Sequence, residues 1–279
     1  MNDNVNPHES PPLHPRAILR SLRQQRGLIL DLAKREVTGR YRGSALGLLW
    51  SFFNPLLMLA VYTFVFSVVF KARWAGGSDS KTEFALVLFT GLMAFNLFSE
   101  CINRAPGLVV GNANYVKKVV FPLELLPFVI LASAAFHMLI SFGVWLLFYL
   151  IFFGMPPLTV LLLPLVLLPL ALLTLGLSWL LASLGVYLRD VTQVTTVITS
   201  VLMFLSPIFY PVSILPAEYR PFLQLNPLTL TIEQARDVMI WGKGLDWAAW
   251  GLYLVVALMI AWLGFAWFQK TRKGFADVL

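Results

Sequence analysis

The fold of this chain is decided by the stretch from Leu125 to Leu188, which reads LLPFVILASAAFHMLISFGVWLLFYLIFFGMPPLTVLLLPLVLLPLALLTLGLSWLLASLGVYL and holds no Asp, Glu, Lys or Arg in 64 residues. One helical crossing of ~30 Å of hydrocarbon takes about 20 apolar residues. The stretch is therefore long enough for two crossings, and the segment 154–157 (GMPP) near its middle predicts the turn between them. This pattern indicates an integral membrane protein.

The composition of the whole chain agrees with a membrane protein. Hydrophobic residues make up 58% of the chain and charged residues 13%, whereas an average soluble domain has roughly 25% charged residues. The net charge of +7 could indicate nucleic-acid binding in a soluble protein, but basic cytoplasmic loops explain it better here. The single cysteine, Cys101, cannot form an intrachain disulfide, and we expect it to be a small core residue. No cleavable signal peptide is expected in the first 42 residues.

Runs without charged residues mark the expected crossings. They predict six spans, at about 45–70, 84–103, 124–153, 158–187, 191–211 and 247–269. The fifth span is irregular, because Pro207 and Pro211 lie at its end. An even number of spans places both termini on the same side of the membrane.

The distribution of basic residues selects that side. With both termini inside, the cytoplasmic segments hold 15 of the 21 Lys and Arg residues, and the outer segments hold the other six. Those six are Lys71, Arg73, Lys81, Arg220, Arg236 and Lys243. The positive-inside rule therefore predicts a multi-pass protein of the cytoplasmic (inner) membrane with both termini in the cytoplasm.

The remaining segments complete the expected architecture. Residues 1–15 are typical of a disordered tail, residues 16–42 of a basic amphipathic helix in the membrane surface, and residues 271–279 of a cytoplasmic tail. A soluble helix that binds another protein is the alternative for residues 16–42. The proline-rich segment 206–244 predicts short outer helices at about 223–230 and 231–241, because a broken backbone at membrane depth needs shielding.

The expected fold class is thus an all-α integral membrane protein. A transmembrane domain at 43–270 contributes six helices, with re-entrant helices on the outer side before the last span.

Three local motifs occur in order along this architecture. They are GRYRGSALGLLW at 39–50 with Asn54-Pro55 after it, YVKKVVFPLELLP at 115–127, and SPIFYP at 206–211 followed by Asn226-Pro227. Together they resemble the permease of a type-2 ABC exporter for polysaccharide, of the O-antigen, capsule and teichoic-acid group. The resemblance extends from about residue 22 to residue 272.

This resemblance implies a half-transporter. Two copies of the chain would pair as a homodimer, and each would bind an ATP-binding subunit, with or without a carbohydrate-binding domain. The cargo would be a polymer on undecaprenyl diphosphate, O-antigen first among the candidates, as in the biosynthesis of lipopolysaccharide or capsule. The chain has no G-x-x-x-x-G-K-[ST] phosphate-binding loop. We therefore expect no catalytic residue, cofactor or metal in it, and ATP and Mg on the partner.

Aromatic residues recur on the first and fifth spans, where a glycan path would need rings to stack against sugars. The candidates for a substrate conduit are Trp50, Phe53, Tyr62, Phe66, Phe204, Phe209 and Tyr210. The alternative is that these rings face lipid or pack between helices.

Charged residues near the inner ends of the spans form a second set. Arg40 and Arg42 could bind the lipid diphosphate, because Arg pairs bidentately with phosphate, or could be simple membrane anchors. Glu100 and Arg104 are spaced for an ion pair on a helix, at the inner mouth. A contact between Glu100 and the polar cargo is the alternative. His137, inside the third span, is expected to be a hydrogen-bonded packing residue rather than a proton relay.

The segment between the second and third spans is the candidate for ATPase coupling. A short cytoplasmic helix there would carry Asn112, Tyr115, Lys117, Lys118 and Phe121. Arg189 and Asp190, at the turn between the fourth and fifth spans, form a plausible second contact. The alternative is a plain positive-inside loop.

Two other functions share parts of this pattern. A type-2 ABC exporter of another lipid or of drugs would have the same fold. A membrane glycosyl- or phosphotransferase would need clustered acids, usually with a metal, but Glu100, Glu124 and Asp190 are scattered along the sequence.

Overall fold

The computed structural model of this chain describes residues 15–65, 81–118 and 121–279, and every regular element in these residues is a helix. The α-helices are α1 (Pro15–Gln24), α2 (Arg26–Arg40), α3 (Trp50–Thr63), α4 (Lys81–Arg104), α5 (Ala113–Lys118), α6 (Leu126–Phe153), α7 (Leu163–Tyr187), α8 (Val191–Leu205), α9 (Arg220–Gln224), α10 (Pro227–Met239), α11 (Trp247–Thr271) and α12 (Phe275–Val278). Short 3-10 helices are η1 (Gly47–Leu49), η3 (Val110–Asn112), η4 (Leu123–Leu125), η5 (Leu158–Leu162), η6 (Val212–Ile214) and η7 (Arg272–Gly274).

Four helical segments among the described residues are long and apolar enough to cross a membrane. They are Lys81–Arg104, Leu123–Phe153, Leu158–Tyr187 and Trp247–Val278. They coincide with the second, third, fourth and sixth predicted spans, and the turn predicted at 154–157 lies between the middle two. Two apolar helices are shorter, Gly47–Thr63 and Val191–Leu205. The predicted end of the first span, residues 66–70, lies outside the described residues, as does the predicted tail up to residue 14.

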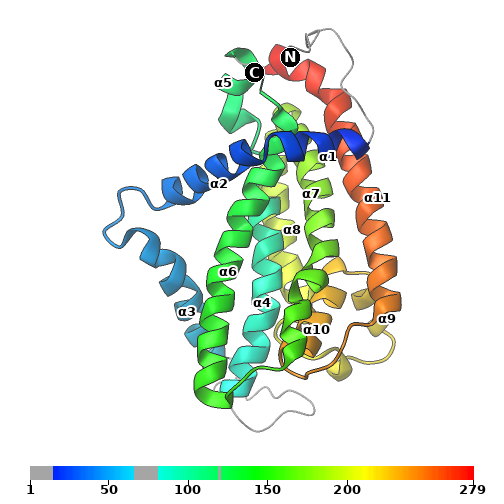
Figure 1. The fold of residues 1–279 in the computed structure, drawn as a ribbon. Coiled ribbons are helices and arrows are strands. Elements are labelled where there is room, and N and C mark those ends of the chain that lie inside the picture. The colour runs from blue at the N-terminus through cyan, green and yellow to red at the C-terminus, as the bar shows by residue number, and fades with distance from the viewer. Residues whose placement is uncertain (1–14, 66–80, 119–120) are drawn as a thin grey trace.

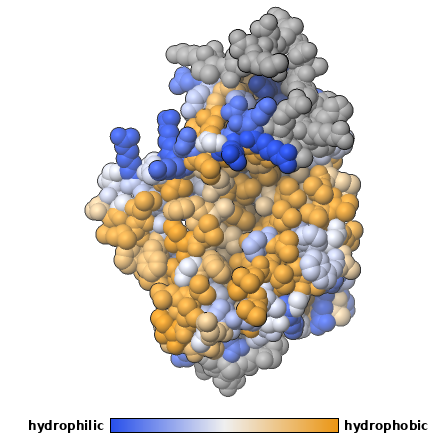
Figure 2. Space-filling view, viewed as in Figure 1, coloured by the Kyte–Doolittle hydropathy of each residue, from blue (hydrophilic) through white to orange (hydrophobic). Residues whose placement is uncertain are grey.

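The long helices form a bundle with α4 at its centre (Figure 1). Helices α1 and α5 lie at one end of the bundle, and α9 and α10 lie at the other. Between the two ends, the visible surface is a broad band of apolar side chains, and hydrophilic side chains border this band at the level of α2 (Figure 2). A surface of this kind is what a bilayer requires of a spanning protein.

Helix α4 supplies the largest share of the core. Buried side chains occupy almost all of its length, and they include Cys101, which is fully buried as expected. Helices α3, α6, α7, α8 and α10 all pack against α4. By contrast, α11 is mostly exposed and packs chiefly against α7.

The closest approach of the α7 and α11 backbones is at two glycines, Gly176 and Gly264. A Cβ atom on Gly264 would lie 2.0 Å from the carbonyl oxygen of Gly176, and a Cβ atom on Gly176 would lie 2.6 Å from the carbonyl oxygen of Ile260. Only glycine permits this approach of one backbone to another. Close packing through small residues is a common way for helices to associate in membranes, where water provides no driving force between them.

The predicted interfacial helix at 16–42 is two helices, α1 and α2, which meet at Gln25. The backbone of Gln25 is not helical (φ −108°, ψ 16°), and Gly27, a poor helix former, follows it closely. The buried residues of α2 are Ile29, Ala33 and Val37. Ile29 and Ala33 form an apolar cluster with residues of η4 and α6, so part of the apolar face of α2 packs on the bundle.

The fifth helix ends earlier than predicted, at Leu205 rather than near 211. Pro207 has no amide hydrogen for a further helical turn, and Ser206 adopts an extended backbone (φ −87°, ψ 149°). Beyond it, the short helices predicted at 223–230 and 231–241 are wrong in their boundaries. The structure has α9 and then a single helix α10, which starts at Pro227 because the side chain of Asn226 accepts a hydrogen bond from the Leu228 amide.

Helix α10 is mostly buried, and Arg236 in its last turn makes most of its polar contacts with the other segments. Its guanidinium donates to the carbonyl oxygens of Val87 (3.1 Å), Pro207 (2.6 Å) and Ile208 (2.8 Å), and it pairs with Glu233 at 3.0 Å. Arg236 is only 1% exposed. The sequence placed Arg236 among the charges of the outer segments; in the structure it satisfies carbonyl groups released where α8 breaks.

The residues after α11 are also packed. Arg272 forms an ion pair with Glu124 of η4 at 2.9 Å, and Trp179 of α7 donates to the Glu124 carbonyl oxygen at 3.0 Å. Phe275 of α12 is fully buried against Tyr187 and Phe268, and α12 contacts α5. The predicted tail at 271–279 thus forms part of the bundle end that carries α5.

Candidate functional site

A cavity of about 1320 Å³ lies between the end of α2, α3, α4 and α6. Its polar lining includes Arg35, Glu36, Arg40, Arg42, Glu100 and Arg104. These four arginines and two glutamates give the lining a net charge of +2. A positively charged hollow of this size, beside an apolar surface, suits an anion attached to a larger molecule.

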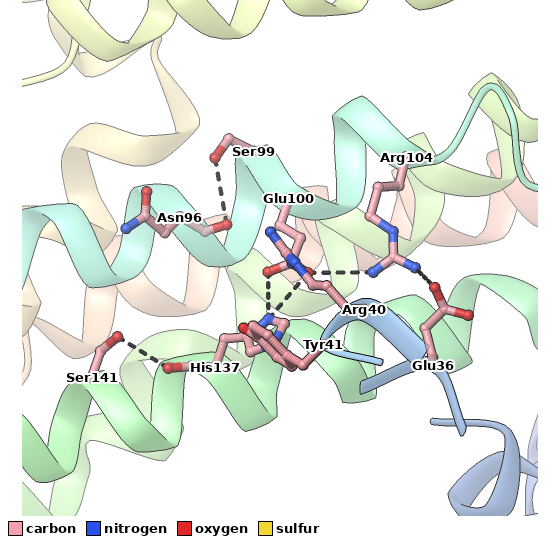
Figure 3. Close-up of polar contacts among 9 residues, drawn as sticks. All are labelled: Glu36, Arg40, Tyr41, Asn96, Ser99, Glu100, Arg104, His137 and Ser141. Carbon is pink, nitrogen blue, oxygen red and sulfur yellow. Dashed lines mark hydrogen bonds and ion pairs between the residues drawn. The ribbon is translucent and has the colours of Figure 1, made fainter. Parts of the chain in front are cut away.

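Glu100 of α4 is the centre of the polar contacts in this cavity (Figure 3). Arg40 Nη1 donates to Glu100 Oε1 at 2.7 Å, and Arg104 Nη1 donates to the same oxygen at 3.3 Å. His137 Nδ1 lies 2.9 Å from Glu100 Oε2. Three elements therefore converge on one carboxylate: the last turn of α2, α4 itself and α6.

A second bridge runs between α2 and α4. Arg104 Nη2 pairs with Glu36, one helical turn before Arg40 on α2. The two bridges have opposite polarity, because α2 gives the cation in Arg40–Glu100 and the anion in Glu36–Arg104. Together they hold α2 against α4 beside the cavity (Figure 3).

Tyr41 follows Arg40 in the sequence and contacts His137, which is itself a partner of Glu100. Its hydroxyl is 3.4 Å from His137 Nε2, and the two rings meet edge to face. Burial raises the pKa of Tyr41 above its usual 10.0, Arg40 opposes the rise and Glu100 adds to it. The phenol therefore stays protonated near neutral pH and can donate a hydrogen bond.

The connection from α2 to α3 depends on glycine. Gly43 and Gly47 have φ values of +86° and +51°, a region that other residues rarely adopt. The GRYRG motif at 39–43 therefore has two parts: two arginines that line the cavity, and a glycine that turns the chain from α2 toward α3.

The structure separates the predicted conduit aromatics into exposed and packed rings. Trp50, Phe53 and Phe204 are exposed, at 40%, 38% and 62%. Phe209 is buried, with its ring centroid 5.5 Å from Tyr62 and 5.8 Å from Phe204. Their role in a conduit stays a prediction. Two further positions complete that set: Tyr210 donates to the Phe204 carbonyl oxygen at 3.2 Å, and Phe66 lies outside the described residues.

The predicted coupling residues gather at the end of the bundle that carries α5. Asn112 donates to the Leu108 carbonyl oxygen at 2.8 Å, and the Tyr115 ring stacks on Phe121 at 4.5 Å. Lys117 and Lys118 end α5, but the placement of their side chains lies outside what the structure describes. Arg189 and Asp190 are exposed in the turn between α7 and α8.

Sequence reasoning missed three of the cluster's connections: Glu36 with Arg104, His137 with Glu100, and Arg40 with Glu100. The partners are 68, 37 and 60 residues apart, so no local spacing links them. A signal was present, because Glu100 and His137 are ionisable residues at or within expected spans, and such residues usually pair with each other. Within the described residues, no group of three or more His, Cys, Asp or Glu side chains could hold a metal ion.

Comparison with known proteins gives one family. The sequence model described as "ABC-2 type transporter" matches residues 28–240. The chain is 28% identical to an O-antigen export system permease protein of Myxococcus xanthus, over 93% of this chain and 98% of that protein. It is 25% identical to an O-antigen export system permease protein of Klebsiella pneumoniae, over 90% and 95%, and 25% identical to a polysialic acid transport protein of Escherichia coli, over 89% and 95%.

Proposed function

Because this chain belongs to the ABC-2 type transporter family, we propose that it is the permease subunit of an ATP-driven exporter of lipid-linked polysaccharide, with O-antigen as the first candidate cargo. One observation carries this proposal: the likeness to O-antigen export permeases extends over nearly the whole length of both chains. The cargo would be a glycan on undecaprenyl diphosphate, moved outward across the inner membrane.

The proposed topology has six spans. The four long helices supply four of them, and α3 and α8 supply the first and fifth. Helix α8 has 15 residues, or about 22 Å at 1.5 Å per residue, so the segment after it would complete the crossing. Helix α10 would be re-entrant, which its burial and the carbonyl contacts of Arg236 support. The excess of basic residues supports cytoplasmic termini.

The proposed transporter contains two copies of this chain. Helix α8 supports a pairing surface, because its exposed face includes Gln193, Thr196 and Ser200 among apolar residues. A face of this kind suits a second copy or a polar path better than lipid. The exposed face of α11 is instead apolar, with large side chains such as Leu252 and Met259, as expected of a lipid-facing helix.

The glycan would pass along the α3–α8 side of each copy. The exposed rings of Trp50, Phe53 and Phe204 lie on these two helices, and aromatic rings bind the CH faces of sugars. The lipid diphosphate would bind Arg40 and Arg42 in the positively charged cavity. The exposed rings on α3 and α8 support the glycan path, and the positive charge of the cavity lining supports the diphosphate site.

The ATP-binding subunit would dock at the end of the bundle that carries α5. Helix α12 contacts both α5 and α7, so movement of α5 can pass to the long helices through packed side chains. ATP and Mg would reside on that subunit, and this chain would supply the path rather than the chemistry.

Reconstitution tests this function directly. The chain and its ATP-binding subunit are placed in proteoliposomes, and ATP hydrolysis is measured with undecaprenyl-diphosphate-linked glycan, with a phospholipid mixture and with a panel of amphipathic drugs. Stimulation by the glycolipid alone is expected. Stimulation by phospholipids or drugs but not by the glycolipid would assign the chain to the other exporters of the family.

A further inference from the structure

Arg40 is proposed above as a ligand of the lipid diphosphate, yet in the structure its guanidinium is already paired with the carboxylate of Glu100. Its Nη1 atom lies 2.7 Å from Glu100 Oε1, a length typical of a charge-assisted hydrogen bond. An incoming phosphate must therefore compete with a carboxylate of the same chain. We propose that Glu100 is a resident counter-ion, which holds Arg40 until a diphosphate headgroup replaces it. This inference rests on the proposed function.

The exposure of the two side chains suits an exchange. The Arg40 side chain is 50% exposed and the Glu100 side chain is 16% exposed. A ligand in the cavity therefore reaches Arg40 without first displacing α4 or α6. Glu100 lies deeper, behind the arginine that it neutralises.

Glu100 would not be left unpaired by the exchange. His137 remains 2.9 Å from Oε2, and Arg104 remains 3.3 Å from Oε1. A buried carboxylate without a partner is costly, but these two groups keep it satisfied after Arg40 leaves. The arrangement therefore allows one of the three partners to leave without exposing a bare charge.

The charge of the cavity favours a diphosphate as the replacing group. The lining has a net charge of +2 from four arginines and two glutamates, and a lipid-linked diphosphate diester has one ionised oxygen on each phosphate. Arg42 lines the same cavity two residues from Arg40. The GRYRG motif therefore supplies two guanidinium groups, one for each phosphate. A monophosphate or a neutral lipid would leave part of this charge unmatched.

The exchange also has a mechanical consequence. Arg40–Glu100 is one of the two bridges between α2 and α4, and Glu36–Arg104 is the other. A headgroup that takes Arg40 removes one bridge and keeps the other. The joint between α2 and α3, which turns at Gly43, is then held to α4 at one point instead of two. Binding of cargo thereby loosens the first span from the core.

The test measures binding to the full chain, assembled with its ATP-binding subunit in nanodiscs without nucleotide. Farnesyl diphosphate is the probe, and isothermal titration calorimetry gives its Kd. Glu100→Gln removes the competing charge and is expected to tighten binding about tenfold, while Arg40→Gln weakens it at least tenfold. Glu36→Gln is the matched control, because it removes an equal charge from the same cavity but no partner of Arg40. Its Kd is expected to change less than about threefold.

The outcomes separate the inference from the function. If Arg40→Gln loses binding but Glu100→Gln matches Glu36→Gln or binds more weakly than wild type, the counter-ion role is wrong and the headgroup site stands. If the wild-type complex does not bind farnesyl diphosphate, or binds it independently of Arg40, the headgroup site fails and the inference fails with it. Glycolipid-stimulated ATP hydrolysis, measured in parallel, tests the export function separately.

Two further arms complete the design. Inorganic pyrophosphate, added as a competitor of farnesyl diphosphate, distinguishes a free anion from a lipid headgroup. A much weaker affinity for pyrophosphate than for farnesyl diphosphate supports a headgroup site, and an equal affinity contradicts it. If Glu100→Gln does not fold, Glu100→Asp replaces it, because the shorter carboxylate withdraws from Arg40. Tighter binding by Glu100→Asp supports the exchange, and unchanged or weaker binding overturns it.

Discussion

Arg236 Nη1 donates to the carbonyl oxygen of Pro207 at 2.6 Å, and this contact ties helix α10 to the break that ends α8. The two residues are 29 positions apart. The same guanidinium reaches Val87 in the central helix. One side chain thus joins three segments, and one of them, the break after α8, has no regular helical hydrogen bonding at this point.

Replacing this arginine tests how much the outer end of the bundle depends on it. Arg236→Met is expected to lower the free energy of unfolding by about 3 kcal/mol or more, because three carbonyl groups lose a donor and Glu233 loses its cation. Arg26→Met, on the exposed face of α2, is the control and should change little. A thiol-reactive fluorescent dye can follow thermal unfolding in detergent, because Cys101 is the single cysteine and is buried. Equal melting temperatures for the two variants would contradict the role of Arg236 in holding α10, α4 and the break after α8 together.

The glycine contact between α7 and α11 predicts a difference between two substitutions on one helix. Gly264→Ala places a methyl group against the Gly176 backbone, whereas a Cβ on Gly251 has nothing within 4 Å. Overpacking costs about 1–3 kcal/mol, which is a fall in melting temperature of roughly 5 °C for Gly264→Ala. Gly251→Ala should leave the temperature unchanged or raise it, since alanine favours a helix. The same dye assay compares them, and similar melting temperatures would show that the helices can separate freely.

The ion pair between Glu124 and Arg272 predicts a rescue by charge exchange. Arg272→Glu would place two carboxylates where the structure has a 2.9 Å ion pair, so the start of α6 would part from the end of α11. We expect it to reduce glycolipid-stimulated ATP hydrolysis several-fold, because η4 follows the α5 segment. Glu124→Arg combined with Arg272→Glu should recover most of this loss. A double variant as poor as the single one would show that the charges act separately.

The proposed homodimer predicts which helix meets its copy. Ile198→Cys on α8 and Met259→Cys on α11 have similar exposure, 48% and 53% for the native side chains. Copper-phenanthroline oxidation in membranes should cross-link the Ile198→Cys chain to a second copy and leave the Met259→Cys chain monomeric on a denaturing gel. The reverse result would place α11 at the interface and remove α8 from the conduit.

The proposed docking of the ATP-binding subunit predicts an effect of charge reversal in α5. Lys117→Glu with Lys118→Glu is expected to abolish co-purification of that subunit, because acidic groups on it would be repelled. Lys243→Glu, near the opposite end of the bundle beside Asp237, should not affect co-purification. Undisturbed assembly and transport in the double variant would remove the two lysines from this role.

Much of the bundle could be predicted because a bilayer imposes a length and a polarity on each helix. The four long spans follow from charge-free runs, and the turn follows from the glycine and two prolines of the segment 154–157; in the structure Gly154 has a φ of 80° there. The end of α8 was placed too late, because apolar residues continue past Leu205 although the backbone does not stay helical. Hydrophobicity alone does not distinguish a spanning helix from a buried break.

The charged cluster could be predicted only in part. The spacing of Glu100 and Arg104 indicates their ion pair, because a helix brings residues four apart together. His137 and Arg40 reach the same carboxylate because α6 packs on α4 and α2 packs on α6, and that packing is a property of the tertiary fold. The burial of Arg236 could not be predicted for the same reason, since its carbonyl partners in α4 and after α8 are distant in sequence.

The contact of Gly176 with Gly264 also limits where cargo can go. Two backbones that meet this closely leave no gap for an acyl chain or a sugar ring, and side chains cannot rotate aside to create one. In the proposed transporter, this contact would therefore close the bundle between α7 and α11 at the level of the two glycines. The polymer and the lipid that carries it would then pass on the side of α3 and α8, so one face of the subunit would stay closed while the opposite face opens.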